Sequence, residues 1–225
     1  MKTTATPLFG LGVTMAAYLL LRPYGDSGDT AATAAAFASP LWVAAHLCGV
    51  LAIAQFARLA LRLDEALAST GRRSTSARPA RTLTLVGLVL CLPYYGTETF
   101  GLHALGRAHR ADPSAGMLAV AEQVRNQPVA LATFGIGLLA LSVAGVLVAL
   151  AWARHSRTMS WAAWPLGVAM ALFPVQFYLP PAGRIGYGLV VAACAALWLV
   201  AVLRRPTDSA PSGVADKFCQ SAAAQ

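Results

Sequence analysis

The chain has 225 residues, of which 57% are hydrophobic and only 12% are charged. Soluble proteins carry about 25% charged residues, so this composition excludes an ordinary soluble domain and indicates a membrane protein. The formal net charge of +8 does not indicate nucleic-acid binding, because most of the arginines border apolar segments and do not form a solvated basic surface.

Six apolar segments approach the length of about 20 residues that a helix needs to cross a bilayer. The first is the shortest and follows Lys2, so a cleaved signal peptide is an alternative to a retained span. Arg22 and Tyr24 form a plausible interfacial border and favour retention. The predicted spans cover residues 7–21, 40–63, 82–105, 128–153, 161–179 and 185–203.

Arginines gather in alternate connections: between the second and third spans, between the fourth and fifth, and after the sixth. The positive-inside rule makes these connections cytoplasmic, and both termini with them. The sequence therefore predicts an all-α, multi-pass helix bundle in the cell membrane. Residues 1–206 form a single six-span domain, and residues 207–225 form a disordered cytoplasmic tail, because their polar, Ala- and Ser-rich composition cannot bury a core.

A short helix is predicted in the outer connection between the third and fourth spans. Asp112 can cap a helix that starts at Pro113. The following apolar residues recur at helical spacing, which indicates an interfacial helix on the outer leaflet, with a plain connector as the alternative. These residues are Met117, Val120, Ala121 and Val124.

Glu98 is the only acidic residue well inside a predicted span. Ionisable groups are costly in hydrocarbon and usually have a function there. The third span begins near Arg81, so Glu98 lies about 25 Å along its axis. His46 lies about 9 Å inward from the opposite end of the second span, which places the two residues at a similar depth.

Two prolines add irregular backbone at this depth. Pro93 and Pro174 each remove an amide from a helix and should kink the third and fifth spans. Polar side chains follow both prolines, Glu98 after the first and Gln176 after the second. Irregular backbone within a membrane is tolerated where it lines protein or water, so a polar and aromatic pocket is expected here.

We predict Glu98 and His46 as catalytic residues of this pocket, with Glu98 as general acid or proton-binding group. The alternative is that Glu98 only makes an interhelical hydrogen bond or ion pair, with Arg184 or His46. The residues expected to bind substrate share the predicted depth or the neighbouring helix faces. They are Tyr94, Tyr95, Thr99, His103, Phe173, Gln176, Phe177, Tyr178, Arg184 and Tyr187.

These features favour an enzyme that acts by acid catalysis on a hydrophobic, isoprenoid or lipid-like substrate. In size, number of spans and membrane-embedded acid the chain resembles small polytopic terpene cyclases, and no individual residue role is carried over from them. The alternative is a non-catalytic binding, transport or accessory protein. A homo-oligomer is then expected, and small residues on the fourth span offer a surface for it: Gly135, Gly137, Ser142 and Gly145.

No cofactor or metal is predicted. A haem held by His46 and His103 is an alternative, although the two residues are offset by about 5 to 10 Å in depth. The sequence contains no phosphate-binding loop, no His-Glu-x-x-His zinc motif and no Gly-x-Ser-x-Gly nucleophile motif. The expected partners are membrane lipids and a hydrophobic small molecule, not nucleic acid.

Overall fold

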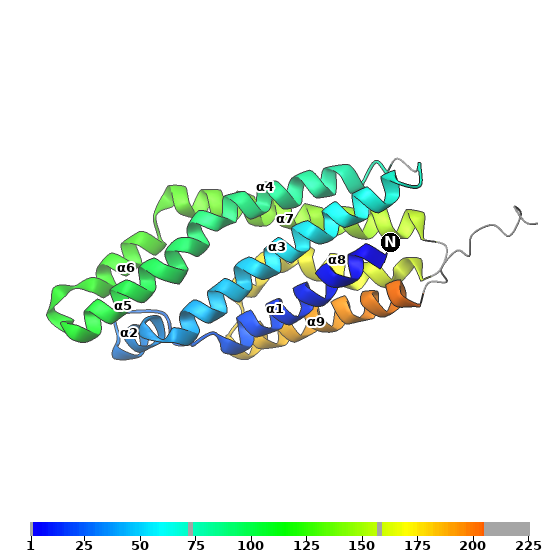
Figure 1. The fold of residues 1–225 in the computed structure, drawn as a ribbon. Coiled ribbons are helices and arrows are strands. Elements are labelled where there is room, and N and C mark those ends of the chain that lie inside the picture. The colour runs from blue at the N-terminus through cyan, green and yellow to red at the C-terminus, as the bar shows by residue number, and fades with distance from the viewer. Residues whose placement is uncertain (1, 72–73, 157–158, 205–225) are drawn as a thin grey trace, which may run out of the picture.

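The computed structural model describes residues 2–71, 74–156 and 159–204, and within these ranges the chain is helical and contains no strand. The predicted tail at residues 207–225 lies outside the described residues. Five long helices form the body of the molecule (Figure 1). They are α1 (Ala5–Leu21), α3 (Pro40–Ala68), α4 (Ala77–Gly96), α7 (Pro128–His155) and α9 (Pro181–Leu203).

Shorter helical segments connect or extend these helices. The α-helical ones are α2 (Ala31–Ala38), α5 (Leu102–Ala111), α6 (Met117–Arg125) and α8 (Trp164–Ala171). Single 3₁₀ segments occur at η1 (Lys2–Thr4), η3 (Pro113–Ala115), η4 (Ser160–Ala163) and η5 (Phe173–Tyr178). The segment η2 (Thr97–Gly101) is a π-helical turn between α4 and α5.

Four helical stretches are long and apolar enough to cross a membrane. They are Pro40–Ala68, Ala77–Ala111, Pro128–His155 and Pro181–Leu203. The other two predicted spans differ in form. Helix α1 is apolar but has 17 residues, and the segment at residues 161–179 is interrupted, with α8 giving way to the 3₁₀ turns of η5.

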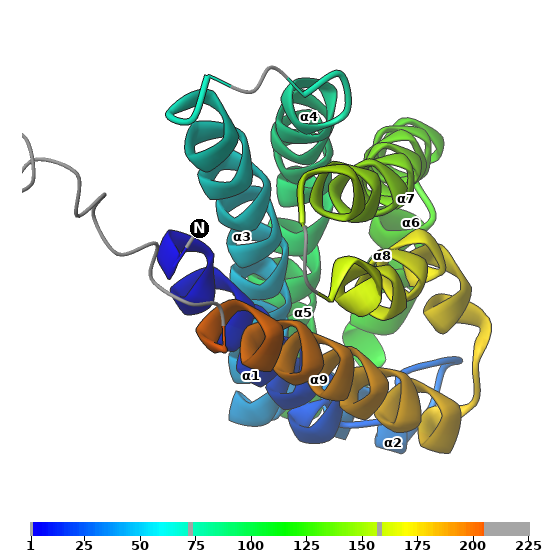
Figure 2. The ribbon, with the colours of Figure 1, turned by 90° about the vertical axis from the view of Figure 1, so that its right-hand side faces the viewer.

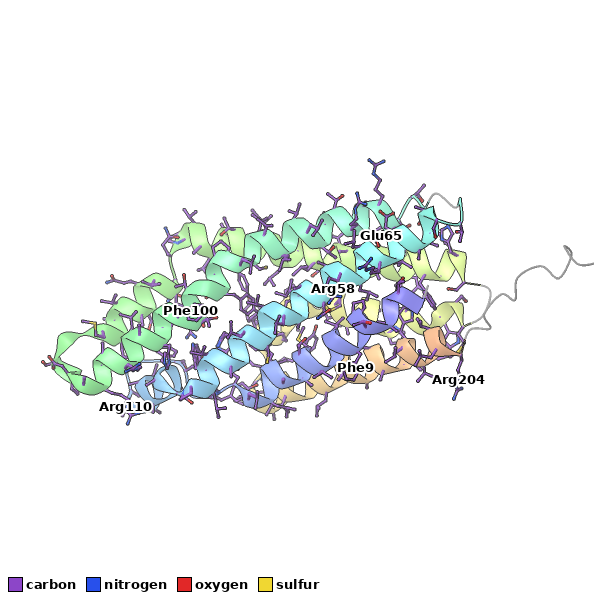
Figure 3. All side chains as sticks on the ribbon, in the orientation of Figure 1. Phe9, Arg58, Glu65, Phe100, Arg110 and Arg204 are labelled. Atoms are coloured by element: carbon purple, nitrogen blue, oxygen red, sulfur yellow. The ribbon has the colours of Figure 1, made fainter. Side chains whose placement is uncertain are left out.

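The long helices pack side by side in a bundle (Figures 1 and 2). Helix α1 packs between α3 and α9, α4 packs on α7, and α8 packs on α7 and α9. Residue 2 and the end of α9 lie at one end of the bundle, together with the α3–α4 connection. Large apolar side chains face outward along the bundle, among them Phe9 and Phe100 (Figure 3).

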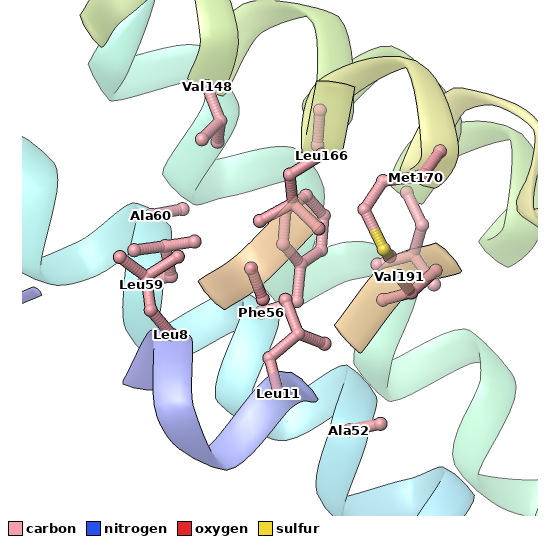
Figure 4. Packing of buried hydrophobic residues seen from close by; sticks show 14 of the residues in the cluster. Leu8, Leu11, Ala52, Phe56, Leu59, Ala60, Val148, Leu166, Met170 and Val191 are labelled. Carbon is pink, nitrogen blue, oxygen red and sulfur yellow. The ribbon is translucent and has the colours of Figure 1, made fainter. Parts of the chain in front are cut away.

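The bundle core is built from aliphatic and aromatic side chains of helices α1, α3, α4, α7, α8 and α9. Figure 4 shows Leu11 of α1 and Phe56 of α3 meeting Leu166 and Met170 of α8 and Val191 of α9. These side chains are at most 1% exposed, so the interrupted helix α8 is an integral part of the core. Between helices surrounded by lipid such side chains stabilise the bundle by van der Waals packing.

Helices α2, α5 and α6 form a cap at the end of the bundle opposite residue 2 and the end of α9 (Figure 1). The stretch from α4 through α5 covers 35 residues, about 52 Å, whereas the hydrocarbon layer is about 30 Å thick. The stretch therefore continues beyond the predicted third span. A second, separate core joins the cap to α3, and consists of Ala34, Phe37, Trp42, Leu102, Leu118 and Ala121.

The connection between the third and fourth predicted spans contains a helix, α6, which begins at Met117 and not at Pro113. Asp112 caps a 3₁₀ turn and not the helix itself, because its carboxylate accepts a hydrogen bond from the Ser114 amide at 3.0 Å. Gly116 then adopts a left-handed conformation, with φ of 63°, and α6 begins at the next residue. The buried residues Leu118 and Ala121 pack into the cap core.

The two prolines act differently. Pro93 lies inside α4 without ending it, and the backbone widens into the π turn only four residues later. Pro174 lacks the amide that an α-helix would need at this position, and α8 ends at Ala171 before it. At Pro174, the helix does not kink but changes completely from α-helical to 3₁₀ geometry.

Candidate functional site

Glu98 lies in the π turn, at the junction between the bundle and the cap, and only 7% of it is exposed. In this turn the Leu102 amide donates to the Thr97 carbonyl, five residues earlier. The Glu98 carbonyl accepts a hydrogen bond from the Trp42 indole nitrogen of α3 at 2.5 Å. Single π turns in α-helices often occur at functional sites. This one places the Glu98 carboxylate near His46 of α3.

Arg125 is the main partner of Glu98. It is the last residue of α6, and its Nε and Nη2 atoms donate to the two carboxylate oxygens at 2.7 and 3.0 Å. This is a bidentate pair, the geometry in which a guanidinium binds a carboxylate most strongly. The predicted partner Arg184 does not fill this role. It donates instead to the carbonyls of Leu179 and Phe177, at 2.9 and 2.7 Å.

Asp26 extends the pair into a chain of alternating charges. Its carboxylate accepts hydrogen bonds from Arg125 at 3.0 Å and from Arg22 at 2.5 Å. The backbone carbonyl of Asp26 accepts a further bond from Arg125 at 2.7 Å. Burial by itself raises the pKa of Asp26, but the positive charges of Arg22 and Arg125 outweigh it and hold the pKa below its usual value.

The Trp42 ring makes cation–π contacts with both arginines. The guanidinium carbons of Arg22 and Arg125 lie 5.1 and 5.8 Å from its ring centroid. Arg125 also lies 5.2 Å from the Phe37 ring. Cation–π contacts of this kind stabilise a desolvated guanidinium, so the buried Arg22 and the partly buried Arg125 gain a further favourable contact.

His46 lies next to Trp42, with 4.2 Å between the ring centroids, and is 1% exposed. Its Nδ1 atom is 2.7 Å from the Trp42 carbonyl, which can only accept, so Nδ1 carries a proton. Its Nε2 atom lies 3.6 Å from a carboxylate oxygen of Glu98. Nε2 has no hydrogen-bond partner in the part of the chain that the structure describes.

A cavity of about 770 Å³ contains these groups. Its polar end is lined by Tyr18, Arg22, Asp26, His46, Tyr94, Tyr95, Glu98, Arg125 and Arg184. Its apolar walls come mainly from α7 and η5, with Leu131, Phe134, Leu138, Leu139, Pro174, Phe177 and Tyr178. Because Leu139 and Tyr178 are 63% and 89% exposed, the cavity reaches the side of the bundle between α7 and η5.

Seven of the predicted site residues line this cavity: Glu98, His46, Tyr94, Tyr95, Phe177, Tyr178 and Arg184. Thr99 and His103 do not. The Thr99 hydroxyl donates to the Tyr95 carbonyl at 2.5 Å, and His103 bonds through Nδ1 to the Phe37 carbonyl of the cap at 2.8 Å. His103 therefore links α5 to α2 within the cap, and it does not line the cavity that contains His46.

Phe173, Gln176 and Tyr187 also lie outside the cavity lining. Phe173 is fully buried against Phe177 and Tyr187. The Tyr187 hydroxyl donates to the Ala169 carbonyl at 2.7 Å. Gln176 is 1% exposed and its side-chain nitrogen has no partner among the described residues.

Sequence reasoning missed Arg22, Asp26 and Arg125 because all three fall in the flanks and outer connections of the predicted spans. One local signal was present. Arg22 and Asp26 stand four residues apart, a spacing that allows an ion pair. No local signal marks Arg125, whose contact with Asp26 joins positions 99 residues apart.

Comparison with known proteins yields no match to a family model, to a curated protein or to a solved structure. Within residues 2–71, 74–156 and 159–204, no group of three or more His, Cys, Asp or Glu side chains could hold a metal ion. The function is therefore argued from the cavity and its charged end.

The lowered pKa of Asp26 predicts a specific acid sensitivity. A carboxylate with a depressed folded-state pKa stabilises the fold above its unfolded pKa of about 4, and this stabilisation is lost as the pH falls through the folded pKa. We expect Asp26→Asn to melt at a lower temperature than the unmodified protein at pH 7, and the difference to shrink as the pH falls below about 4. Melting curves in detergent across this range measure both effects.

Asp29→Asn is the matched control, because Asp29 lies in the same connection and is exposed. It should melt like the unmodified protein at every pH. A melting-temperature difference between Asp26→Asn and the unmodified protein that does not shrink as the pH falls below about 4 would contradict the assigned ion pairs, because protonation of Asp26 removes the charge that distinguishes it from asparagine.

Proposed function

We propose that this chain is a multi-pass cell-membrane protein that binds a hydrophobic, lipid-like small molecule in the cavity beside Glu98. The proposal includes six crossings, with α1 and the interrupted segment around α8 added to the four long stretches. The arginine-rich connections then lie in the cytoplasm with both termini. The cap of α2, α5 and α6 lies at the outer face, where α6 rests near the lipid interface.

The observation that carries the proposal is the shape and chemistry of the cavity. One end is charged and buried, the walls are aliphatic and aromatic, and the rim residues Leu139 and Tyr178 are exposed on the side of the bundle. An opening on the side of a membrane-spanning bundle faces lipid. A molecule that enters there must be largely apolar, and the charged end selects for one polar group.

Acid–base catalysis on the same molecule is a second candidate, and one contact favours it. His46 lines the cavity, and its Nε2 atom lies 3.6 Å from Glu98 with no hydrogen-bond partner among the described residues. Glu98 itself is a poor general acid in this arrangement, because the bidentate pair with Arg125 binds its ionised form. Cyclisation started by protonating a carbon–carbon double bond needs a stronger acid than an imidazolium, so the geometry supports binding before cyclase chemistry.

The test is to fill the cavity without disturbing the bundle. Gly135 of α7 lines the cavity, and a Cβ added to it would meet no other atom within 4 Å. We expect Gly135→Trp to reduce co-purifying or added apolar ligand by about tenfold or more, because the indole occupies the ligand's volume. Native mass spectrometry of the protein released from nanodiscs measures the bound molecules.

Ile136→Trp provides the matched control. Ile136 is the next residue of α7, is 57% exposed and does not line the cavity. It should retain ligand like the unmodified protein. Equal ligand occupancy in Gly135→Trp, Ile136→Trp and the unmodified protein would refute binding at this cavity.

A further inference from the structure

The polar end of the cavity contains an unsatisfied hydrogen-bonding atom, His46 Nε2. The side chain is 99% buried, since its exposure is 1%, and Nε2 has no partner among the described residues. Leaving a buried polar atom unpaired costs about 1 to 3 kcal/mol. Such an atom, when it lines a cavity, points to a group that the ligand supplies. This inference rests on the proposed binding function and concerns the ligand's polar group.

The hydrogen bonds of His46 determine what the ligand must offer. Nδ1 donates to the Trp42 carbonyl at 2.7 Å, so in the neutral ring Nε2 carries a lone pair and accepts. Glu98 cannot satisfy this atom, because the carboxylate 3.6 Å away also only accepts. The missing partner is therefore a hydrogen-bond donor.

The charges around His46 exclude most charged donors and anions. Arg125 is paired with Glu98 and Asp26, and Arg22 is paired with Asp26. Two guanidiniums and two carboxylates thus compensate one another, and Arg184, which also lines the cavity, donates to the carbonyls of Leu179 and Phe177. An added phosphate or carboxylate would face both acidic groups and the Nε2 lone pair, and an added ammonium would face both arginines. A neutral donor meets neither cost.

A second open position strengthens the assignment. Arg22 Nε is also buried without a partner among the described residues, and Arg22 lines the same end of the cavity. Nε can only donate, whereas His46 Nε2 accepts. A hydroxyl group both donates and accepts, so it is the smallest neutral group that suits this end of the cavity.

We infer that the ligand is a lipid-like alcohol whose hydroxyl donates a hydrogen bond to His46 Nε2 while its hydrocarbon chain lies along Phe134, Leu138 and Phe177. The Trp42 backbone carbonyl positions the His46 ring. Glu98 lies next to the ligand hydroxyl, but His46 accepts its hydrogen bond. Recognition then depends on the donor hydrogen and not on negative charge.

The test compares three probes that share one hydrocarbon chain: farnesol, farnesyl methyl ether and farnesyl phosphate. The full chain in phosphatidylcholine nanodiscs should bind farnesol about tenfold more tightly than the ether, which has no donor. Farnesyl phosphate should not bind more tightly than farnesol. Titration followed by tryptophan fluorescence gives the dissociation constants, because Trp42 lies against His46.

Two substitutions separate the acceptor atom from the structural role of the ring. In His46→Asn the side-chain amide can still donate to the Trp42 carbonyl, but nothing replaces Nε2. In His46→Gln the longer amide places an acceptor near the position of Nε2. We expect His46→Asn to lose the preference for farnesol over the ether and His46→Gln to keep most of it, at comparable melting temperatures.

Equal binding of farnesol and its ether by the unmodified protein would overturn the hydroxyl assignment and leave the cavity as an apolar binding site. An unchanged preference in His46→Asn would also overturn it. Tightest binding of farnesyl phosphate, lost in Arg184→Gln, would assign the site to an anionic headgroup. If none of the three probes binds, the proposed binding function fails together with this inference.

Discussion

Glu98→Gln is expected to lower the free energy of unfolding by about 3 kcal/mol, because the partly buried guanidinium of Arg125 then keeps Asp26 as its one charged partner among the described residues. The carboxylate makes two hydrogen bonds to Arg125, and its side chain is 9% exposed. The alternative that Glu98 only stabilises the fold can therefore be tested by measuring the free energy of unfolding. A loss of ligand binding in this variant is informative only beside its stability, measured by equilibrium unfolding in mixed micelles.

Glu65→Gln is the matched control for this experiment. Glu65 pairs with Arg62 at 2.9 Å, but both side chains are nearly half exposed. Exposed pairs of this kind contribute about 0 to 1 kcal/mol. A double-mutant cycle that combines Glu98→Gln with Arg125→Gln should return a coupling energy of about 2 kcal/mol. Coupling near zero would show that the two side chains do not stabilise one another.

Gly137→Ala is expected to lower the free energy of unfolding by about 2 kcal/mol, by forcing apart the helices α4 and α7. A Cβ at Gly137 would lie 2.8 Å from the Cys91 sulfur and 3.1 Å from the Gly87 carbonyl oxygen. The backbone atom cannot move without its helix. Gly137 is therefore committed to a contact within the chain, and so is not a free part of the small-residue surface expected for a homo-oligomer.

Gly135→Ala is the control from the same helix, since its Cβ would meet no other atom within 4 Å. Alanine is the better helix former by up to about 1 kcal/mol, so this variant should be as stable as the unmodified protein or slightly more stable. The comparison uses one chemical change at positions two residues apart. Similar melting temperatures for both variants would contradict the close approach of α4 and α7.

Hydropathy predicted the helices well where a span is a single unbroken helix. The stretch beginning at Pro40 and the stretch beginning at Pro128 start at the predicted residue, because proline is favoured in the first turn. Hydropathy could not predict the break in the fifth span, because the 3₁₀ segment Phe173–Tyr178 is as apolar as a helix would be. Apolar composition reports burial and does not distinguish α from 3₁₀ geometry.

The break also changes the helix faces on which the residues of the fifth predicted span lie, because an α-helix turns about 100° per residue and a 3₁₀ helix about 120°. Within the 3₁₀ segment, Phe177 and Tyr178 line the cavity, whereas Phe173 and Gln176 do not. Depth along a helix axis was the more dependable guide. It brought His46 and Glu98 together, and the structure places them 3.6 Å apart. It could not identify Arg125, which approaches from a connection folded over the end of the bundle.

The π turn at Thr97–Gly101 acts as an angular offset within one continuous helical rod. It accommodates about one residue more than an α-helical turn, and one residue corresponds to about 100° of rotation. The π turn therefore determines how far α5 is rotated about the helix axis relative to α4. Gly106 thereby packs against α2, where an added Cβ would lie 2.5 Å from the Phe37 Cβ and 3.1 Å from the Ala34 carbonyl oxygen, and Glu98 pairs with Arg125. The one extra residue of the π turn thus determines both the packing of α5 in the cap and the orientation of Glu98 in the cavity.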